Sequence, residues 1–207
     1  MEVDLPVPAK QQRLEIDPPE VIEARLRRFY PAVSDVASIP MRWSSKIETH
    51  DLSGHHIELR ENRTVVEYQG PAETTHKDAR AVRTADPIPR ACGLFYFEVK
   101  VISKGKNGYI AVGIADDKVK LGRLPGWDDN SYGYHGDDGN VFTGSGQGSS
   151  YGPTFTTGDV IGCCYDMVAK SVFFTKNGEN LDTAFKDVSN KGLVQYRLWF
   201  STTLELS

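Results

Sequence analysis

The chain has 207 residues, enough for one sizeable domain with an appendage. Hydrophobic residues make up 39% and charged residues 25%, which excludes a chain that is disordered or fibrous throughout. The 24 basic and 28 acidic side chains give a net charge of −4, so the general phosphate-backbone binding that a basic stripe supports is not expected, and nucleic acid is excluded as a partner.

The sequence predicts a protein that does not bind or span a membrane. No run of about 18 apolar residues occurs, and residues 1–6 lack the basic start and apolar stretch of a signal peptide. The three cysteines cannot form the even framework of a small secreted domain, so we expect free thiols and a cytoplasmic location. A sequon at Asn62-Arg63-Thr64 leaves one alternative open, a secreted protein that has lost its signal peptide and buries its thiols.

The first thirty residues predict two segments outside the main body. Prolines at positions 6, 8, 18 and 19 break regular structure, so residues 1–19 are expected to form a flexible arm. Residues 20–30 predict a short amphipathic helix that ends before Pro31, because apolar residues recur at helical spacing at Ile22, Leu26, Phe29 and Tyr30.

Residues 31–207 are expected to form an all-β body, since short β-rich runs separated by Gly, Asn and Asp follow Trp43. The run 95–102 alternates, so Phe95, Phe97, Val99 and Val101 should share a core face. Asn107-Gly108 predicts a hairpin turn from this run into 109–114. Asn177-Gly178 predicts a second hairpin turn after 171–175. Many short strands at close spacing indicate a sandwich or a barrel.

Motifs for catalysis, cofactors and metals are weak. Gly144, Gly146 and Gly148 are not followed by Gly-Lys-Ser/Thr, so a phosphate loop is not expected. His135 stands near Asp137 and Asp138, but no paired Cys or His at zinc spacing occurs, and surface histidines with turn-forming acids are the better interpretation. No GxSxG elbow is present. We therefore expect no enzyme, no cofactor and no metal site.

A series of motifs then occurs in a recognisable order. It comprises Asp86-Pro87-Ile88-Pro89, Ala91-Cys92-Gly93, Tyr96-Phe97-Glu98-Val99, Leu124-Pro125-Gly126-Trp127, residues 131–139 (SYGYHGDDG), Tyr151-Gly152-Pro153-Thr154-Phe155, residues 158–164 (GDVIGCC) and Phe174-Thr175-Lys176-Asn177-Gly178. Together these motifs closely resemble the SPRY domain of RanBPM-like proteins. The resemblance is strong from Lys77 to Asp187 and weaker upstream, through residues 26–33 and Trp43.

The resemblance implies a bent SPRY-type sandwich of two antiparallel sheets whose loops bind a partner protein, without catalysis or cofactor. RanBPM-like proteins are scaffolds, often tied to ubiquitin-ligase assemblies. A similar stand-alone SPRY form occurs among secreted effectors of plant-parasitic nematodes, which act inside host cells. The expected function is therefore a protein or peptide interaction module, as a scaffold, an adaptor or a host-targeted effector.

The C-terminal sequence departs from the family pattern. Past Val188 the family has a Tyr-Pro strand and a closing strand with Asn-Phe-Gly, whereas this chain reads GLVQYRLWF over residues 192–200 and ends at Ser207. Either residues 200–206 substitute for the last strand, or the sheet keeps an exposed edge that favours self-association.

The binding surface is expected around the loop 121–129, because Trp and Arg are frequent at interface hot spots. Its predicted members are Arg80, Arg83, Arg123, Leu124, Pro125, Trp127, Asp128 and Asp129. For Trp127, packing at the end of the sandwich is an equally good interpretation. The alternative function is a glycan-binding sandwich, because Trp127, Tyr132 and Tyr134 interleave with acids and amides at 128–130. Residues 132–134 and 137–139 are otherwise expected to serve packing and turns.

Overall fold

The structure, a computed structural model, describes residues 42–44, 57–69, 81–106, 108–188, 194–199 and 203–206, together with Glu20, Val21, Ala24, Arg27 and Arg28. Those five residues have helical geometry and are exposed, but the residues between them and the whole of 1–19 lie outside the described part. The arm and the helix over 20–30 therefore stay predictions. Among the described residues, no helix has the length and apolar character needed to cross a membrane.

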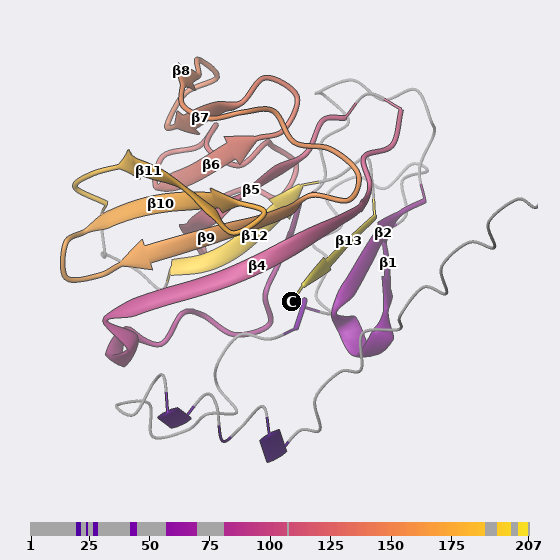
Figure 1. Cartoon of the computed structure of the whole chain (residues 1–207), viewed down its shortest axis with the longest axis horizontal. Coiled ribbons are helices and arrows are strands. Elements are labelled where there is room, and N and C mark those ends of the chain that lie inside the picture. The colour runs from indigo at the N-terminus through magenta and orange to yellow at the C-terminus, as the bar shows by residue number, and fades with distance from the viewer. Residues whose placement is uncertain are drawn as a thin grey trace, which may run out of the picture.

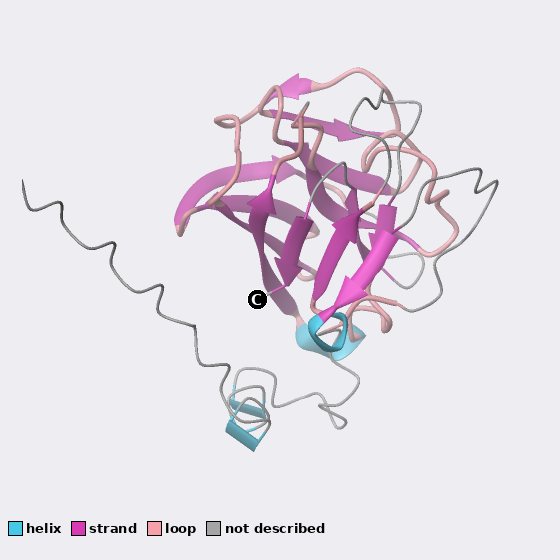
Figure 2. Cartoon of the chain, turned by 90° about the vertical axis from the view of Figure 1, so that its right-hand side faces the viewer, coloured by secondary structure: helices cyan, strands magenta, loops and turns pink. Residues whose placement is uncertain are grey.

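The described strands form two antiparallel sheets, which confirms the predicted all-β sandwich (Figures 1 and 2). The seven-stranded sheet has the order β1 (Ile57–Arg60), β2 (Val65–Tyr68), β13 (Thr203–Leu206), β4 (Leu94–Ser103), β9 (Val160–Asp166), β10 (Ser171–Lys176) and β11 (Glu179–Phe185). The six-stranded sheet has the order β3 (Ala81–Arg83), β12 (Val194–Trp199), β5 (Ala111–Asp116), β6 (Ser131–His135), β7 (Asn140–Thr143) and β8 (Ser149–Ser150). Short 3-10 turns occur at η2 (Glu61–Arg63) and η4 (Arg90–Cys92).

The last two strands lie inside the sheets, each paired on both sides. β13 pairs with β2 and β4, and Figure 1 shows it between them. β12 pairs with β3 and β5. β13, which lies within the expected segment 200–206, therefore takes the place of the missing closing strand, which was the first of the two alternatives. The edge strands of the seven-stranded sheet are β1 and β11, so the open edge that motivated the self-association hypothesis is absent at β13.

The two Asn-Gly turns have different outcomes. Asn177-Gly178 makes the predicted hairpin, with Lys176 opposite Glu179 and positive φ values of 52° and 83° at the two turn residues. The hairpin predicted at Asn107-Gly108 is wrong, because β4 and β5 belong to different sheets. Near its end β4 bonds instead to the segment before β9, where Val101 and Asp159 are joined by a 2.9 Å hydrogen bond. The chain after β4 consequently crosses to the other sheet.

The core lies between the sheets and confirms the alternation of β4. Phe95, Phe97, Val99 and Val101 are all buried there. From β6, the fully buried Tyr134 ring packs at a centroid distance of 5.1 Å from Phe155 and 5.3 Å from both Tyr151 and Phe174. These tilted and edge-on contacts are the arrangements that aromatic rings favour.

The three cysteines are free, as predicted. Cys163 pairs with the core residue Phe97 and Cys164 with its neighbour Tyr96, so the two thiols lie on opposite faces of β9. Burial raises the pKa of Cys92 to about 11 and that of Cys164 to about 12. Because the thiolate is the reactive form, these groups are poor nucleophiles at neutral pH.

Two buried tyrosines offer a matched test of the core. The Tyr134 hydroxyl donates to the carbonyl of Pro153, whereas the Tyr165 hydroxyl is buried and has no hydrogen-bond partner among the described residues. We expect Tyr165→Phe to raise the free energy of unfolding by about 1 kcal/mol, since it removes an unsatisfied polar group. Tyr134→Phe should lower that free energy by about 1 kcal/mol. Urea unfolding measures both, and equal losses in the two variants would contradict this account of Tyr165.

Candidate protein-binding site

Small residues of β5 and β6 line the outer face of the six-stranded sheet. Val112 and Ile114 of β5 are part of the main core, so their neighbours Ala111, Gly113 and Ala115 lie on the opposite face. In the register with β6 these three residues pair with His135, Gly133 and Ser131, respectively. A loop can therefore approach the backbone of this sheet closely.

The loop between β5 and β6 packs on this outer face. Leu121 and Leu124 form a small buried cluster with Ala81 and Ala111, and Trp127 packs against its side. Gly133 permits the contact, because a Cβ atom there would lie 2.5 Å from the carbonyl oxygen of Pro125. We call residues 116–130, which run along this face, the loop platform.

Buried hydrogen bonds fix the middle of the loop platform. The Gly126 backbone N–H donates to Ser131 Oγ over 2.7 Å. His135 Nε2 lies 2.8 Å from the carbonyl oxygen of Pro125, and because a carbonyl only accepts, this nitrogen carries the proton. Gly126 has φ of +91°, and a Cβ there would lie 2.3 Å from the Phe142 carbonyl oxygen. These contacts hold the Leu124–Trp127 turn close against β6 and β7.

His135 corrects the prediction of surface histidines. It is 3% exposed, since the loop platform covers it and its ring stacks on Phe142 at a centroid distance of 4.0 Å. Burial lowers the pKa of His135 to about 4. The other histidines, at positions 50, 55, 56 and 76, lie outside the described residues.

The group formed by His135, Asp137 and Asp138 has ligand atoms within 4.8 Å of one another, but hydrogen bonds within the protein account for it. His135 Nε2 is bonded to the Pro125 carbonyl, and both Asp138 carboxylate oxygens accept N–H groups of Asn140. The two aspartates are exposed and close the β6–β7 turn. This arrangement fits the turn role expected of residues 137–139.

The depressed pKa of His135 predicts a pH dependence of stability. Between pH 6.5 and about 4 the unfolded chain binds a proton that the folded chain does not, so the free energy of unfolding falls as pH decreases through this window. Above pH 6.5 this stability is fully present, and lowering the pH to about 4 should reduce the free energy of unfolding by about 3 kcal/mol. His135→Gln keeps a donor for Pro125 and should remove this component from unfolding curves measured at pH 4 to 7. Identical pH profiles in the two proteins would show that His135 is not the group responsible.

The structure brings several predicted site residues together around the loop platform. Arg123 forms an ion pair with Asp128, with side-chain exposures of 48% and 16%, and Asp128 also accepts the Lys120 backbone N–H at 3.2 Å. The Arg83 guanidinium donates to the Asp117 carbonyl over 2.9 Å, which joins β3 to the same loop. Asp129 is exposed.

Other predicted site residues are not surface groups. Leu124 and Pro125 are buried and Trp127 is half-buried, so these three side chains anchor the loop to the sheet and are not exposed for contact with a partner. Arg80 lies outside the described residues.

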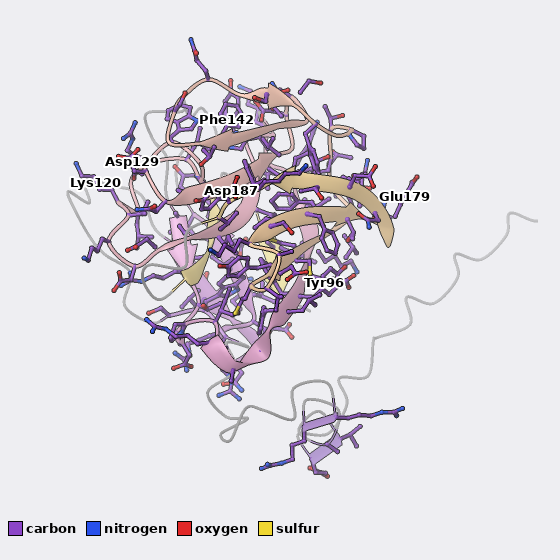
Figure 3. All side chains as sticks on the ribbon, turned by 90° about the vertical axis from the view of Figure 1, so that its left-hand side faces the viewer. Tyr96, Lys120, Asp129, Phe142, Glu179 and Asp187 are labelled. Atoms are coloured by element: carbon purple, nitrogen blue, oxygen red, sulfur yellow. The ribbon has the colours of Figure 1, made fainter. Side chains whose placement is uncertain are left out.

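A groove of about 390 Å³ opens beside the Arg123–Asp128 pair. Its lining residues are Asp116, Lys118, Val119, Lys120, Asp128, Asp129 and Asn130. Figure 3 shows Lys120 and Asp129 on one side of the protein and Glu179 and Tyr96 on the other. The four lining residues between positions 116 and 120 were missed by sequence reasoning, although the charged run Asp116-Asp117-Lys118-Val119-Lys120 was a usable signal.

The comparisons with known proteins decide the family. The SPRY domain family matches residues 94–201. The chain belongs to the SPRY domain family. Ran-binding protein 10 of Danio rerio is 49% identical over 168 residues, which are 81% of this chain and 27% of that protein. Ran-binding protein 9 of Homo sapiens is also 49% identical over 168 residues, covering 81% of this chain and 22% of that protein.

The solved structures agree with the fold. A crystal structure of a human SPRY domain matches with a TM-score of 0.62 and 27% identity, covering 74% of this chain and 96% of that one. The chain spans about a quarter of the length of the two Ran-binding proteins. The similarity to them confirms the resemblance to RanBPM-like SPRY domains.

The two tyrosines of β6 in this SPRY domain serve packing. Tyr134 is fully buried, and the half-buried Tyr132 packs edge-on against Phe185 at 5.2 Å. A sugar-stacking site needs exposed ring faces, so the proposed partnership of these rings with Trp127 has no geometric support.

Alanine substitutions of Trp127 and Arg123 should differ in their effect on the free energy of unfolding. Trp127→Ala removes packing against the cluster of Ala81, Ala111, Leu121 and Leu124, and we expect a loss of about 2 kcal/mol or more in the free energy of unfolding. Arg123→Ala removes an exposed ion pair and should cost less than about 1 kcal/mol. Thermal and urea unfolding of both variants check this. A Trp127→Ala protein as stable as wild type would contradict the packing role.

Proposed function

We propose that this SPRY domain is a non-catalytic module that binds a partner protein or peptide through the loop platform. The observation that carries the proposal is the groove, which places exposed charged side chains on a loop that is fixed from below. A loop held by buried hydrogen bonds loses little conformational freedom on binding, which favours affinity. The platform therefore has the properties of a preformed recognition surface.

Two charged side chains at the groove are available for a partner. The Lys118 ammonium and the Asp129 carboxylate are exposed, and neither makes a hydrogen bond or an ion pair within the described part of the chain. Asp128, in contrast, is engaged by Arg123 and by the Lys120 backbone. The partner would thus contact Lys118, Asp129 and the exposed part of Arg123, while Asp128 and Trp127 maintain the shape of the site.

Several observations support a binding role over catalysis. The cysteine thiols have raised pKa values, and the Nε2 of His135 is committed to the Pro125 carbonyl. The SPRY match and the two Ran-binding relatives support a protein-interaction module. We further propose that the module serves as a scaffold, an adaptor or a host-targeted effector. We also propose that it acts in a reducing cytoplasm, which the free thiols support.

A site-specific photo-crosslinking experiment tests the proposed surface. A benzophenone amino acid replaces Asp129 on the loop platform in one protein, and Glu179 of β11, on the opposite side in Figure 3, in a matched control. Both proteins are irradiated in extracts of the source cells. We expect discrete adducts from position 129 that Lys118→Glu diminishes severalfold, and no equivalent adducts from position 179. Adducts formed only from position 179 would place the binding surface elsewhere.

A further inference from the structure

The loop platform starts and ends in two arms that lie beside each other. The first arm is 116–120, which begins at the last residue of β5, and the second is 128–130, which directly precedes β6. The Asp116 backbone N–H donates to the Asn130 carbonyl over 2.9 Å and joins the arms where they leave the sheet. The residues that line the groove all belong to these arms, so the arms are its two walls.

A second hydrogen bond joins the arms farther along, and two opposite charges lie between the two bonds. The Lys120 backbone N–H donates to an Asp128 carboxylate oxygen over 3.2 Å. Lys118 is the middle residue of the first arm and Asp129 the middle residue of the second. Both are exposed and line the groove, yet no ion pair joins them within the described part of the chain. A segment that enters the groove therefore meets a positive charge on one wall and a negative charge on the other.

The other carboxylates of the groove are engaged inside the loop platform. Asp116 Oδ1 accepts the Lys118 backbone N–H over 3.0 Å, and Asp128 forms the ion pair with Arg123. The Asp129 carboxylate, in contrast, accepts no hydrogen bond from the described residues, and the Lys118 ammonium donates none to them. A ligand can therefore engage Lys118 and Asp129 without breaking a bond inside the loop platform.

We propose that the groove recognises an extended peptide segment of mixed charge, in which an acidic side chain binds the Lys118 ammonium and a basic side chain binds the Asp129 carboxylate. The inference rests on the proposed function and names the partner chemistry of that site. Hydrogen bonds between ionised groups are shorter and stronger than those between neutral groups. Alternate side chains of an extended peptide share one face, so an acid and a base can reach the groove together.

A ligand whose charges all have one sign fits this groove less well. An acidic peptide would place a carboxylate near Asp129, and a basic peptide would place a cation near Lys118. Like charges brought together across an interface oppose binding and exclude wrong partners. A phosphorylated residue adds about two negative charges and would be repelled by Asp129 more strongly than an Asp or Glu side chain.

The test begins with selection on the full chain from a phage-displayed library of random dodecapeptides. Selected peptides should carry one acid and one base at a fixed spacing. In a synthetic copy of a selected peptide, replacing either residue with Ala should weaken binding about threefold or more in fluorescence anisotropy, since solvent-exposed ion pairs are individually weak. Higher salt should weaken the binding of the unmodified peptide, because it screens exposed charges.

Exchange of the two charges makes the assignment specific. The variant Lys118→Glu/Asp129→Lys should bind a peptide with its acid and base exchanged about tenfold or more tightly than the selected peptide, whereas wild type should show the opposite preference. The control Lys104→Glu/Glu179→Lys makes the same changes at exposed positions outside the loop platform and should keep the wild-type preference. If the double variant does not fold, Lys118→Glu and Asp129→Lys alone should each weaken binding of the selected peptide about tenfold.

Three results would overturn the inference. These are selected peptides with charge of one sign only, mixed-charge peptides that bind the charge-exchanged variant as tightly as wild type, and failure to select any peptide. The photo-crosslinks expected from position 129 report on the proposed function independently. Their presence would leave that function standing when the mixed-charge preference fails. Their absence together with that failure would reject both proposals.

Discussion

The placement of β12 and β13 inside the two sheets is the constraint on which the rest of the structure depends. Within the described strands, the β1–β2 hairpin joins the seven-stranded sheet only through β13, and β3 joins the six-stranded sheet only through β12. An isolated hairpin is marginally stable, so the N-terminal strands need the C-terminal ones. Trp43 adds a second connection, because it is fully buried, bridges to Thr84 and donates its indole N–H to the Thr64 carbonyl at 2.9 Å. The position of Arg83 beside the loop platform follows directly from this pairing.

The candidate site is built in layers from that sheet. The small residues of β5 and β6 line the outer face of the six-stranded sheet, and packing by Leu121, Leu124 and Trp127 holds the loop against this face. Ser131 and His135 satisfy the backbone groups of the Pro125-Gly126 turn from below. Apolar and small residues thus determine the shape of the platform, while charged residues at its rim are exposed. This division explains why most of the motif residues support the site and few of them contact solvent.

Sequence reasoning succeeded where local rules act alone. The alternation in β4 predicted its core face, and Asn177-Gly178 predicted a hairpin, because both depend on neighbouring residues. The same rule failed at Asn107-Gly108, where long-range pairing of β4 with β9 and β13 prevailed over a local turn signal. His135 was expected at the surface, whereas the loop that directly precedes β6 folds back over it, a tertiary contact that the local sequence pattern does not reveal. The groove was missed for a similar reason, because its walls come from both ends of that loop.

The central claim is that partners bind on the outer face of the six-stranded sheet, at the loop platform and the adjoining end of β3. Hydrogen–deuterium exchange of the full chain, free and bound to a peptide selected against it by phage display, tests this claim most directly. The account predicts that slowed exchange on binding is confined to residues 116–130 and 81–84, with little change in β4, β9, β10 and β11. Protection centred on the seven-stranded sheet, with an unchanged loop platform, would contradict it.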